Sequence, residues 1–105
     1  MPRRAHSQAG ELNRALDVAL SHGDLALALG AAKELPAVDL ARAARLLHLM
    51  AHDHSPLFDK AAARWMARFA VEVSGVTAEQ LAVAADAITS LPDLQAAETL
   101  LDSVR

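Results

Sequence analysis

The sequence predicts an all-α protein: a compact bundle of about six short helices, with two αα-hairpins around a central helix that carries the aromatic residues. Alanine and leucine, both strong helix formers, make up 42 of the 105 residues. Residues that favour β-strands are scarce, because Val, Ile, Thr, Phe and Trp total 14 and there is no Tyr. A hydrophobic content of 53% with a net charge of −3 supports a packed core rather than a disordered chain.

The first helix follows a short arm. We expect residues 1–10 to form a flexible N-terminal arm and residues 11–105 to form a single helical domain. Ser7 can cap the first helix, and Gly23 supplies the left-handed residue that often ends one. Between them an apolar stripe has helical spacing: Leu12, Ala15, Leu16, Ala19 and Leu20.

Aspartate caps define two further helices. Asp24 caps a second helix that stops before Pro36, and Asp39 caps a third over residues 40–51. The third helix is apolar on most sides, and Leu49 lies nearly opposite its main apolar arc. A helix of this kind is central to a fold or has a second partner.

The fourth helix holds the aromatic residues. Ser55 followed by Pro56 is a typical helix start, and Gly75 ends the segment. All three aromatic residues of the chain share one face of this helix: Phe58, Trp65 and Phe69. We therefore expect the tryptophan to lie in the core rather than on a ligand-binding surface.

Two segments near the ends of the domain are similar to each other. Thr77 and Gln80 form a capping box that opens a fifth helix, and Asp93 caps a sixth. Segments 25–36 and 81–92 match at six of twelve positions, and a capping aspartate and a helix follow each. The pattern predicts two αα-hairpins, either by duplication or because alanine raises the number of chance matches.

The runs Leu35-Pro36, Ala-Arg-Trp-Met-Ala-Arg-Phe at 63–69 and Val76-Thr77 resemble small uncharacterised helical proteins of high-GC actinobacteria. The resemblance extends over most of the chain after the first ten residues. It implies a fold-sized helical unit and brings no activity with it.

The sequence also restricts the cellular context. The absence of cysteine excludes disulfides, thiolate metal sites and cysteine nucleophiles. No apolar run follows Arg3 and Arg4, as an export signal would require, and the longest uncharged apolar stretch, 25–32, is too short for a bilayer. We expect a cytoplasmic protein with no membrane partner.

A histidine cluster is the first candidate site. His48 and His52 are four residues apart on the third helix, and His54 follows beside Asp53. Imidazoles and a carboxylate can hold zinc, nickel or copper, so a metal site is one hypothesis. The sequence favours the other, a structural or solvated cluster at a helix C-terminus, and no cofactor.

Basic residues on the fourth helix form the second candidate. A ridge at positions i, i+4 and i+8 lies opposite the aromatic face: Lys60, Arg64 and Arg68. With Arg3 and Arg4 it could meet phosphates or an acidic partner. The simpler interpretation is a solvated face on which Arg68 pairs with Glu72. Residues 69–105 carry a net charge of −5, which disfavours nucleic-acid contact there.

No catalytic signature stands out, because the chain lacks a Gly-rich phosphate loop, a nucleophile elbow and a paired-carboxylate motif. We therefore expect no enzyme activity. Surplus apolar surface, with Leu49 as its clearest example, predicts a non-catalytic module that binds another protein or itself, most simply as a homodimer. The alternatives are a nucleic-acid-associated regulator that uses the basic ridge and a metal-binding protein that uses the histidines.

Overall fold

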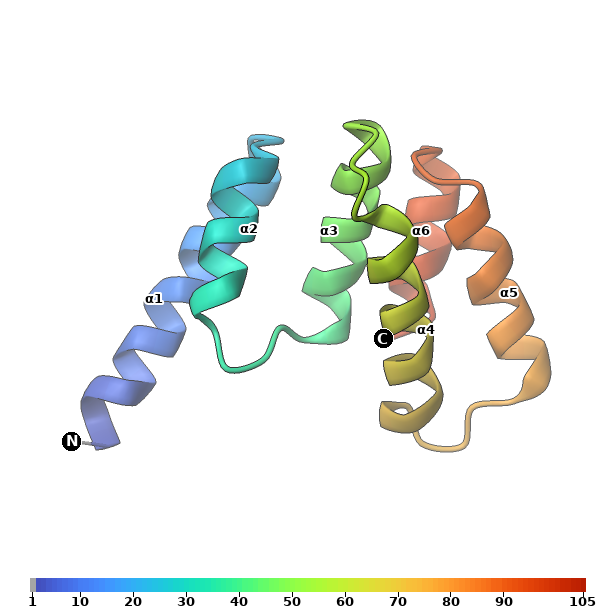
Figure 1. Cartoon of the computed structure of the whole chain (residues 1–105). Coiled ribbons are helices and arrows are strands. Elements are labelled where there is room, and N and C mark those ends of the chain that lie inside the picture. Colours follow the sequence, from blue (N-terminus) through green and yellow to red (C-terminus); the bar gives the residue numbers. More distant parts are fainter. Residues whose placement is uncertain (1) are drawn as a thin grey trace. The chain divides into compact units, whose positions relative to one another are not determined.

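The computed structural model describes residues 2–105, with the side chains of residues 8–105. Helices follow one another along the chain: α1 (Pro2–Ser21), α2 (Leu25–Glu34), α3 (Leu40–His52), α4 (Phe58–Glu72), α5 (Ala78–Thr89) and α6 (Leu94–Asp102) (Figure 1). None of residues 2–105 forms a β-strand. The predicted all-α class, with six helices in the described part of the chain, is confirmed.

The chain divides into two compact units, one ending at Val38 and the other spanning Asp39–Arg105. This differs from the single helical domain predicted over residues 11–105. The division follows from local packing, because α1 and α2 pack closely on each other as a hairpin. After that hairpin Leu35 is extended, with φ −80° and ψ 141°, and Pro36 prevents the helix from continuing.

The first helix is longer than the sequence suggested. It begins at Pro2, so residues 2–10, predicted as a flexible arm, are helical, and Ser7 lies inside the helix instead of capping it. Proline is favoured in the first turn of a helix, and residues 3–9 contain no glycine, proline or β-branched residue to interrupt it.

Gly23 reverses the chain between α1 and α2. Its φ of +68° is left-handed, as predicted. The Gly23 N–H donates to the Leu20 carbonyl at 3.2 Å, and the Asp24 N–H donates to the Ala19 carbonyl at 3.0 Å. These are the two bonds of a Schellman motif, which satisfies carbonyls at the end of α1. Asp24 then caps α2, as predicted, by accepting from the Leu27 N–H at 3.0 Å.

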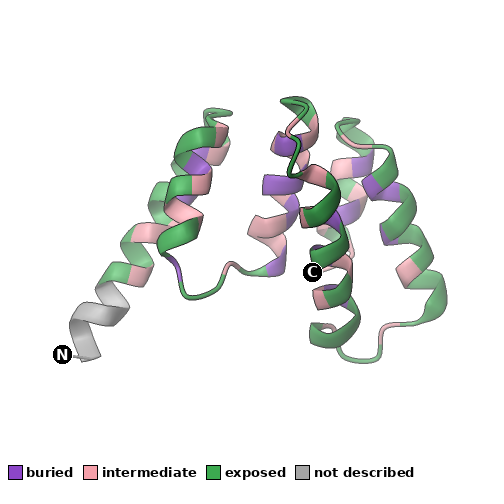
Figure 2. Ribbon diagram, in the orientation of Figure 1, coloured by how far each residue is buried: buried purple, intermediate pink, exposed green. Residues whose placement is uncertain are grey.

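The second unit is a ring of four helices. α3 packs against α4 and α6, and α5 packs against the same two helices. The aromatic helix α4 therefore forms one side of the ring, and not the centre that the sequence predicted. The inward faces form the core (Figure 2), whose buried residues are Leu40, Ala44, Leu46, Leu47, Met50, Ala62, Trp65, Phe69, Ala84, Ala87, Ile88, Ala96 and Leu100.

Polar groups fix the ends of three of these helices. Asp39 accepts from the Arg42 N–H at 2.8 Å, and Asp93 accepts from the Ala96 N–H at 3.0 Å. The capping box at the start of α5 is complete, with both of its hydrogen bonds formed. Each of these predicted caps is confirmed. A cap of this kind stabilises a helix by about 1 kcal/mol.

The predicted start of α4 is wrong by two residues, because the helix begins at Phe58 and no side chain caps it. The Ser55 N–H donates to the Met50 carbonyl at 2.8 Å, so Ser55 completes the end of α3. Its hydroxyl accepts from the Leu57 N–H at 3.2 Å, which forms one extra turn before the helix.

The two predicted hairpins have different outcomes. α5 packs against α6 across the short turn at 90–93, as the repeat predicted. α2 and α3 belong to different units, and α2 pairs with α1 instead.

Candidate functional site

His48 joins two parts of the second unit. It lies on α3, and its Nε2 atom is 3.0 Å from the Pro92 carbonyl oxygen in the turn between α5 and α6. A carbonyl oxygen only accepts, so Nε2 carries a proton and donates it. This hydrogen bond leaves Nδ1 as the only ring nitrogen of His48 that could ligate a metal ion. The imidazole therefore holds the α5–α6 turn against α3.

The backbone of His54 caps the C-terminal end of α3. Its φ of +53° places it in the left-handed region that glycine usually occupies. The His54 N–H donates to the Ala51 carbonyl at 3.2 Å, and Ser55 makes the accompanying bond to Met50 described above. His54 thus occupies the position in α3 that Gly23 occupies in α1, in a second Schellman motif.

His52 points to its neighbour and away from a shared site. Its Nδ1 atom is 3.1 Å from the Asp53 carboxylate on the exposed end of α3. Among the residues that the structure describes, no group of three or more His, Cys, Asp or Glu side chains could hold a metal ion. His48, His52 and His54 are close in sequence, but the structure does not bring them together as ligands.

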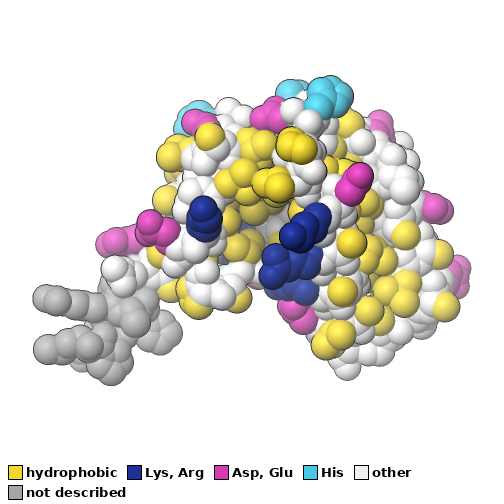
Figure 3. Space-filling model, viewed as in Figure 1, with side chains coloured by type: hydrophobic (Ala, Val, Ile, Leu, Met, Phe, Trp, Pro, Cys, Tyr) yellow, Lys and Arg dark blue, Asp and Glu magenta, His cyan; other side chains and the backbone are white. Residues whose placement is uncertain are grey.

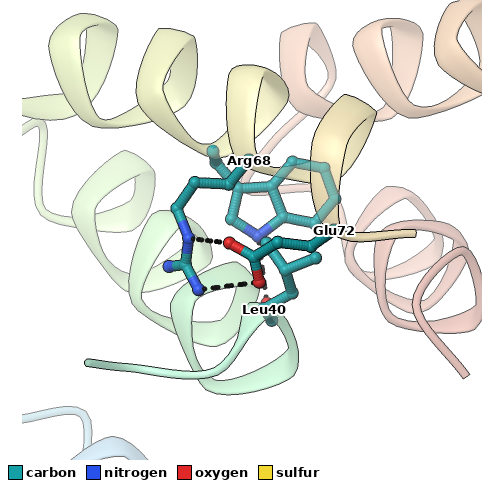
Figure 4. Close-up of polar contacts among 4 residues, drawn as sticks. Leu40, Arg68 and Glu72 are labelled. Atoms are coloured by element: carbon teal, nitrogen blue, oxygen red, sulfur yellow. Dashed lines mark hydrogen bonds and ion pairs between the residues drawn. The ribbon is translucent and has the colours of Figure 1, made fainter. Parts of the chain in front are cut away.

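The basic ridge of α4 divides into a paired and an unpaired part. Arg68 donates to both carboxylate oxygens of Glu72, from Nε at 2.7 Å and from Nη2 at 3.2 Å (Figure 4). The Arg68 hydrogen bond lowers the pKa of Glu72. This is the pairing predicted for a solvated face. Because Arg68 is paired with Glu72, it is not a free cation that could bind a phosphate.

Lys60 and Arg64 remain available. Both are exposed, and neither makes an ion pair with the residues that the structure describes. Basic side chains gather over α3 and α4 in the view of Figure 3. Arg3 and Arg4, which the nucleic-acid hypothesis added to the ridge, lie outside the residues whose side chains are described. Two unpaired cations are a small footprint for a nucleic acid.

The apolar residues of α3 and α4 that were candidates for a binding surface are mainly buried. Trp65 is 2% exposed, and its indole Nε1–H donates to the Leu40 carbonyl at 3.0 Å, also drawn in Figure 4. Its ring stacks on Phe69 with centroids 5.2 Å apart. Leu49 is half-buried, so the free apolar patch predicted around it is not where the exposed aliphatic residues lie.

The larger exposed aliphatic side chains of the second unit include Leu57, 52% exposed just before α4, and residues on α4, α5 and α6. Val71 on α4 is 84% exposed, Leu94 at the start of α6 is 73% exposed, and Val83 on α5 is 46% exposed. Leu94 has the spacing of the apolar stripe expected for the sixth helix and is nevertheless exposed, whereas Val71 and Val83 lie outside the expected stripes. The available signal was a valine at position 71, seven residues after Arg64 and on the same face.

A groove of ≈ 340 Å³ lies between α5 and α6, and no pattern in the sequence predicts it. Two of the residues that line it, Ala87 and Ala96, are buried alanines. The groove is lined by Val83, Asp86, Ala87, Ser90, Asp93, Gln95, Ala96 and Thr99. It combines an aliphatic wall, two carboxylates and neutral polar groups, and it contains no basic side chain.

Comparisons of the chain with protein-family models, with curated proteins and with solved structures found no match. Across the described residues, no helix combines the length and the apolar character that crossing a membrane requires.

Proposed function

We propose that this protein is a non-catalytic helical module that binds another protein chain. The observation that carries the proposal is the exposure of large aliphatic side chains on the second unit. Val71 is almost fully exposed, and Leu94 and Val83 are also open to solvent. Hydrophobic side chains are also visible over α4 and α5 in the view of Figure 3.

Burial by a partner would stabilise these side chains. Complete burial of an exposed Val or Leu side chain is worth about 1.5–3 kcal/mol. Several such residues on one unit therefore provide a substantial part of the free energy of a protein contact. Exposed apolar side chains beside charged groups are typical of interaction surfaces.

The polar side chains support a binding role better than a chemical one. Asp24, Asp39 and Asp93 accept backbone N–H groups at the starts of helices. Thr77 does the same in the capping box, and His48 holds a turn. These groups are occupied with maintaining the fold. On the second unit, the described surface features that remain include exposed aliphatic residues, the cations Lys60 and Arg64, and the acidic groove.

Photo-crosslinking tests this function. A photoreactive amino acid is introduced at Val71, at Leu94 or at the control position Asp53, which is exposed in the turn after α3. We expect adducts of defined mass at Val71 and Leu94 and none at Asp53. A yield at Val71 and Leu94 no higher than at Asp53 would contradict the proposal.

A further inference from the structure

The α5–α6 hairpin presents an acidic groove. Residues 78–102 contain five acidic residues and no Lys or Arg. In the groove, the Asp86 carboxylate has no hydrogen-bond or ion-pair partner among the described residues. Asp93 uses one carboxylate oxygen to cap α6. Val83 lines the groove and is 46% exposed, so acidic and aliphatic surface lie side by side.

The outer face of α4 has the complementary character. Lys60 and Arg64 are one helical turn apart, and Val71 follows Arg64 by two turns on the same face. Both cations are exposed and unpaired within the described residues, and Val71 is the most exposed of the larger aliphatic side chains there. This face thus combines free positive charge with free aliphatic surface.

We propose, on the basis of the protein-binding function above, that the partner is a second copy of this chain, whose α4 outer face docks in the α5–α6 groove. Arg64 and Lys60 of one copy face Asp86 and Asp93 of the other, and Val71 lies on the same docked face.

The spacing of the two cations fits the length of the groove. Val83 on α5 and Ser90, the C-cap of that helix, are seven residues apart, so the groove extends for about 10 Å along α5. Lys60 and Arg64 are four residues apart, which separates them by about 6 Å along α4. Two cations at that spacing fit within the length of the groove.

A single chain cannot make this contact within itself. α5 packs against both α4 and α6 in the helix ring, and the groove lies on the α5–α6 side. Accordingly, neither Lys60 nor Arg64 pairs with Asp86 in the structure. A second copy carries both surfaces, so a two-fold dimer makes the α4–groove contact twice.

Sedimentation velocity with charge-reversal variants tests the proposal. Arg64→Glu and Asp86→Arg each place like charges across the contact, and we expect each to weaken the dimer about tenfold, as disruption of a close interfacial charge pair does. The chain that carries both substitutions restores the opposite charges and is expected to regain most of the affinity. Lys33→Glu and Asp53→Arg make the same changes in net charge at exposed residues that belong to neither surface and serve as controls.

Circular dichroism confirms that each variant is folded before its association is measured. Three results would overturn the proposal: a wild-type chain that is monomeric up to about 1 mM, equal weakening by Arg64→Glu and Lys33→Glu, or a double variant no tighter than either single one. If the chain is monomeric but Val71 crosslinks to a different protein, the second-copy proposal fails while the protein-binding function stands. If neither dimer nor crosslink forms, both fail.

Discussion

Replacing Trp65 by phenylalanine tests how strongly the buried indole stabilises the second unit. The variant loses the hydrogen bond to the Leu40 carbonyl at 3.0 Å and about three ring atoms from a site that is 2% exposed in the wild type. The hydrogen bond is worth about 1 kcal/mol. The lost ring atoms are worth roughly 2 kcal/mol at about 0.8 kcal/mol each. We expect Trp65→Phe to lower the free energy of unfolding by about 3 kcal/mol.

Urea unfolding followed by circular dichroism at 222 nm measures this change, because it needs no tryptophan signal. The midpoint should fall while the denaturant slope stays constant, since the surface exposed on unfolding barely changes. Heating should show a fall in Tm of roughly 10–20 °C for a unit of this size. Incorporating benzothienylalanine at Trp65 keeps the bicyclic shape and removes only the N–H donor, so it should cost about 1 kcal/mol. A Trp65→Phe variant within about 0.5 kcal/mol of the wild type would refute the reasoning.

Further predictions concern the histidines and the surface ion pair. His48→Ala should lower the free energy of unfolding by about 1 kcal/mol in urea titrations, because the bond to Pro92 is lost, while the exposed control His52→Ala should change it by less than about 0.5 kcal/mol. At the left-handed His54, valine should destabilise by about 1–2 kcal/mol and glycine should not, and equal stability of the two variants would contradict the assignment. Glu72→Gln should be less stable than the wild type at pH 7. Because Arg68 lowers the pKa of folded Glu72, this difference should shrink as the pH falls below the ordinary value of 4.5 and disappear once Glu72 is protonated in the folded protein. Thermal unfolding between pH 7 and pH 3 measures it.

Features that depend on neighbouring residues were predictable from the sequence. Asp24, Asp39, Thr77 and Asp93 each bond an N–H three residues further along, so the cap is determined within one turn. Ser55 shows the limit of this reasoning. The Ser-Pro pair has the pattern of a helix start, but the Ser55 N–H is already bonded to Met50 in the preceding helix.

Features that depend on distant residues could not be predicted in this way. The His48 imidazole and the Pro92 carbonyl are 44 residues apart, and no local pattern links them. The groove between α5 and α6 has the same origin, because its lining residues come from two helices that lie side by side. The pairing of α2 with α1 rather than with α3 could not be predicted either, because α1 and α3 have apolar stripes of similar appearance. The burial of Leu49 could not be predicted for the same reason, because it depends on the packing of neighbouring helices and not on the position of Leu49 on a helical wheel.

Val71 connects these considerations to the proposed function. At 84% exposure it contributes almost nothing to the core, and valine is a weaker helix former than alanine or lysine by a few tenths of a kcal/mol. Folding therefore gives no reason for a valine at this position, and the fold would gain from its replacement. The same helix uses alanine or charged residues at most of its other outward positions, including Lys60, Arg64 and Ala67. A side chain whose exposure lowers the stability of the folded monomer becomes stabilising when a partner surface buries it. Replacement of Val71 on the outer face of α4 should therefore change the affinity for a partner and the stability of the free chain in opposite directions.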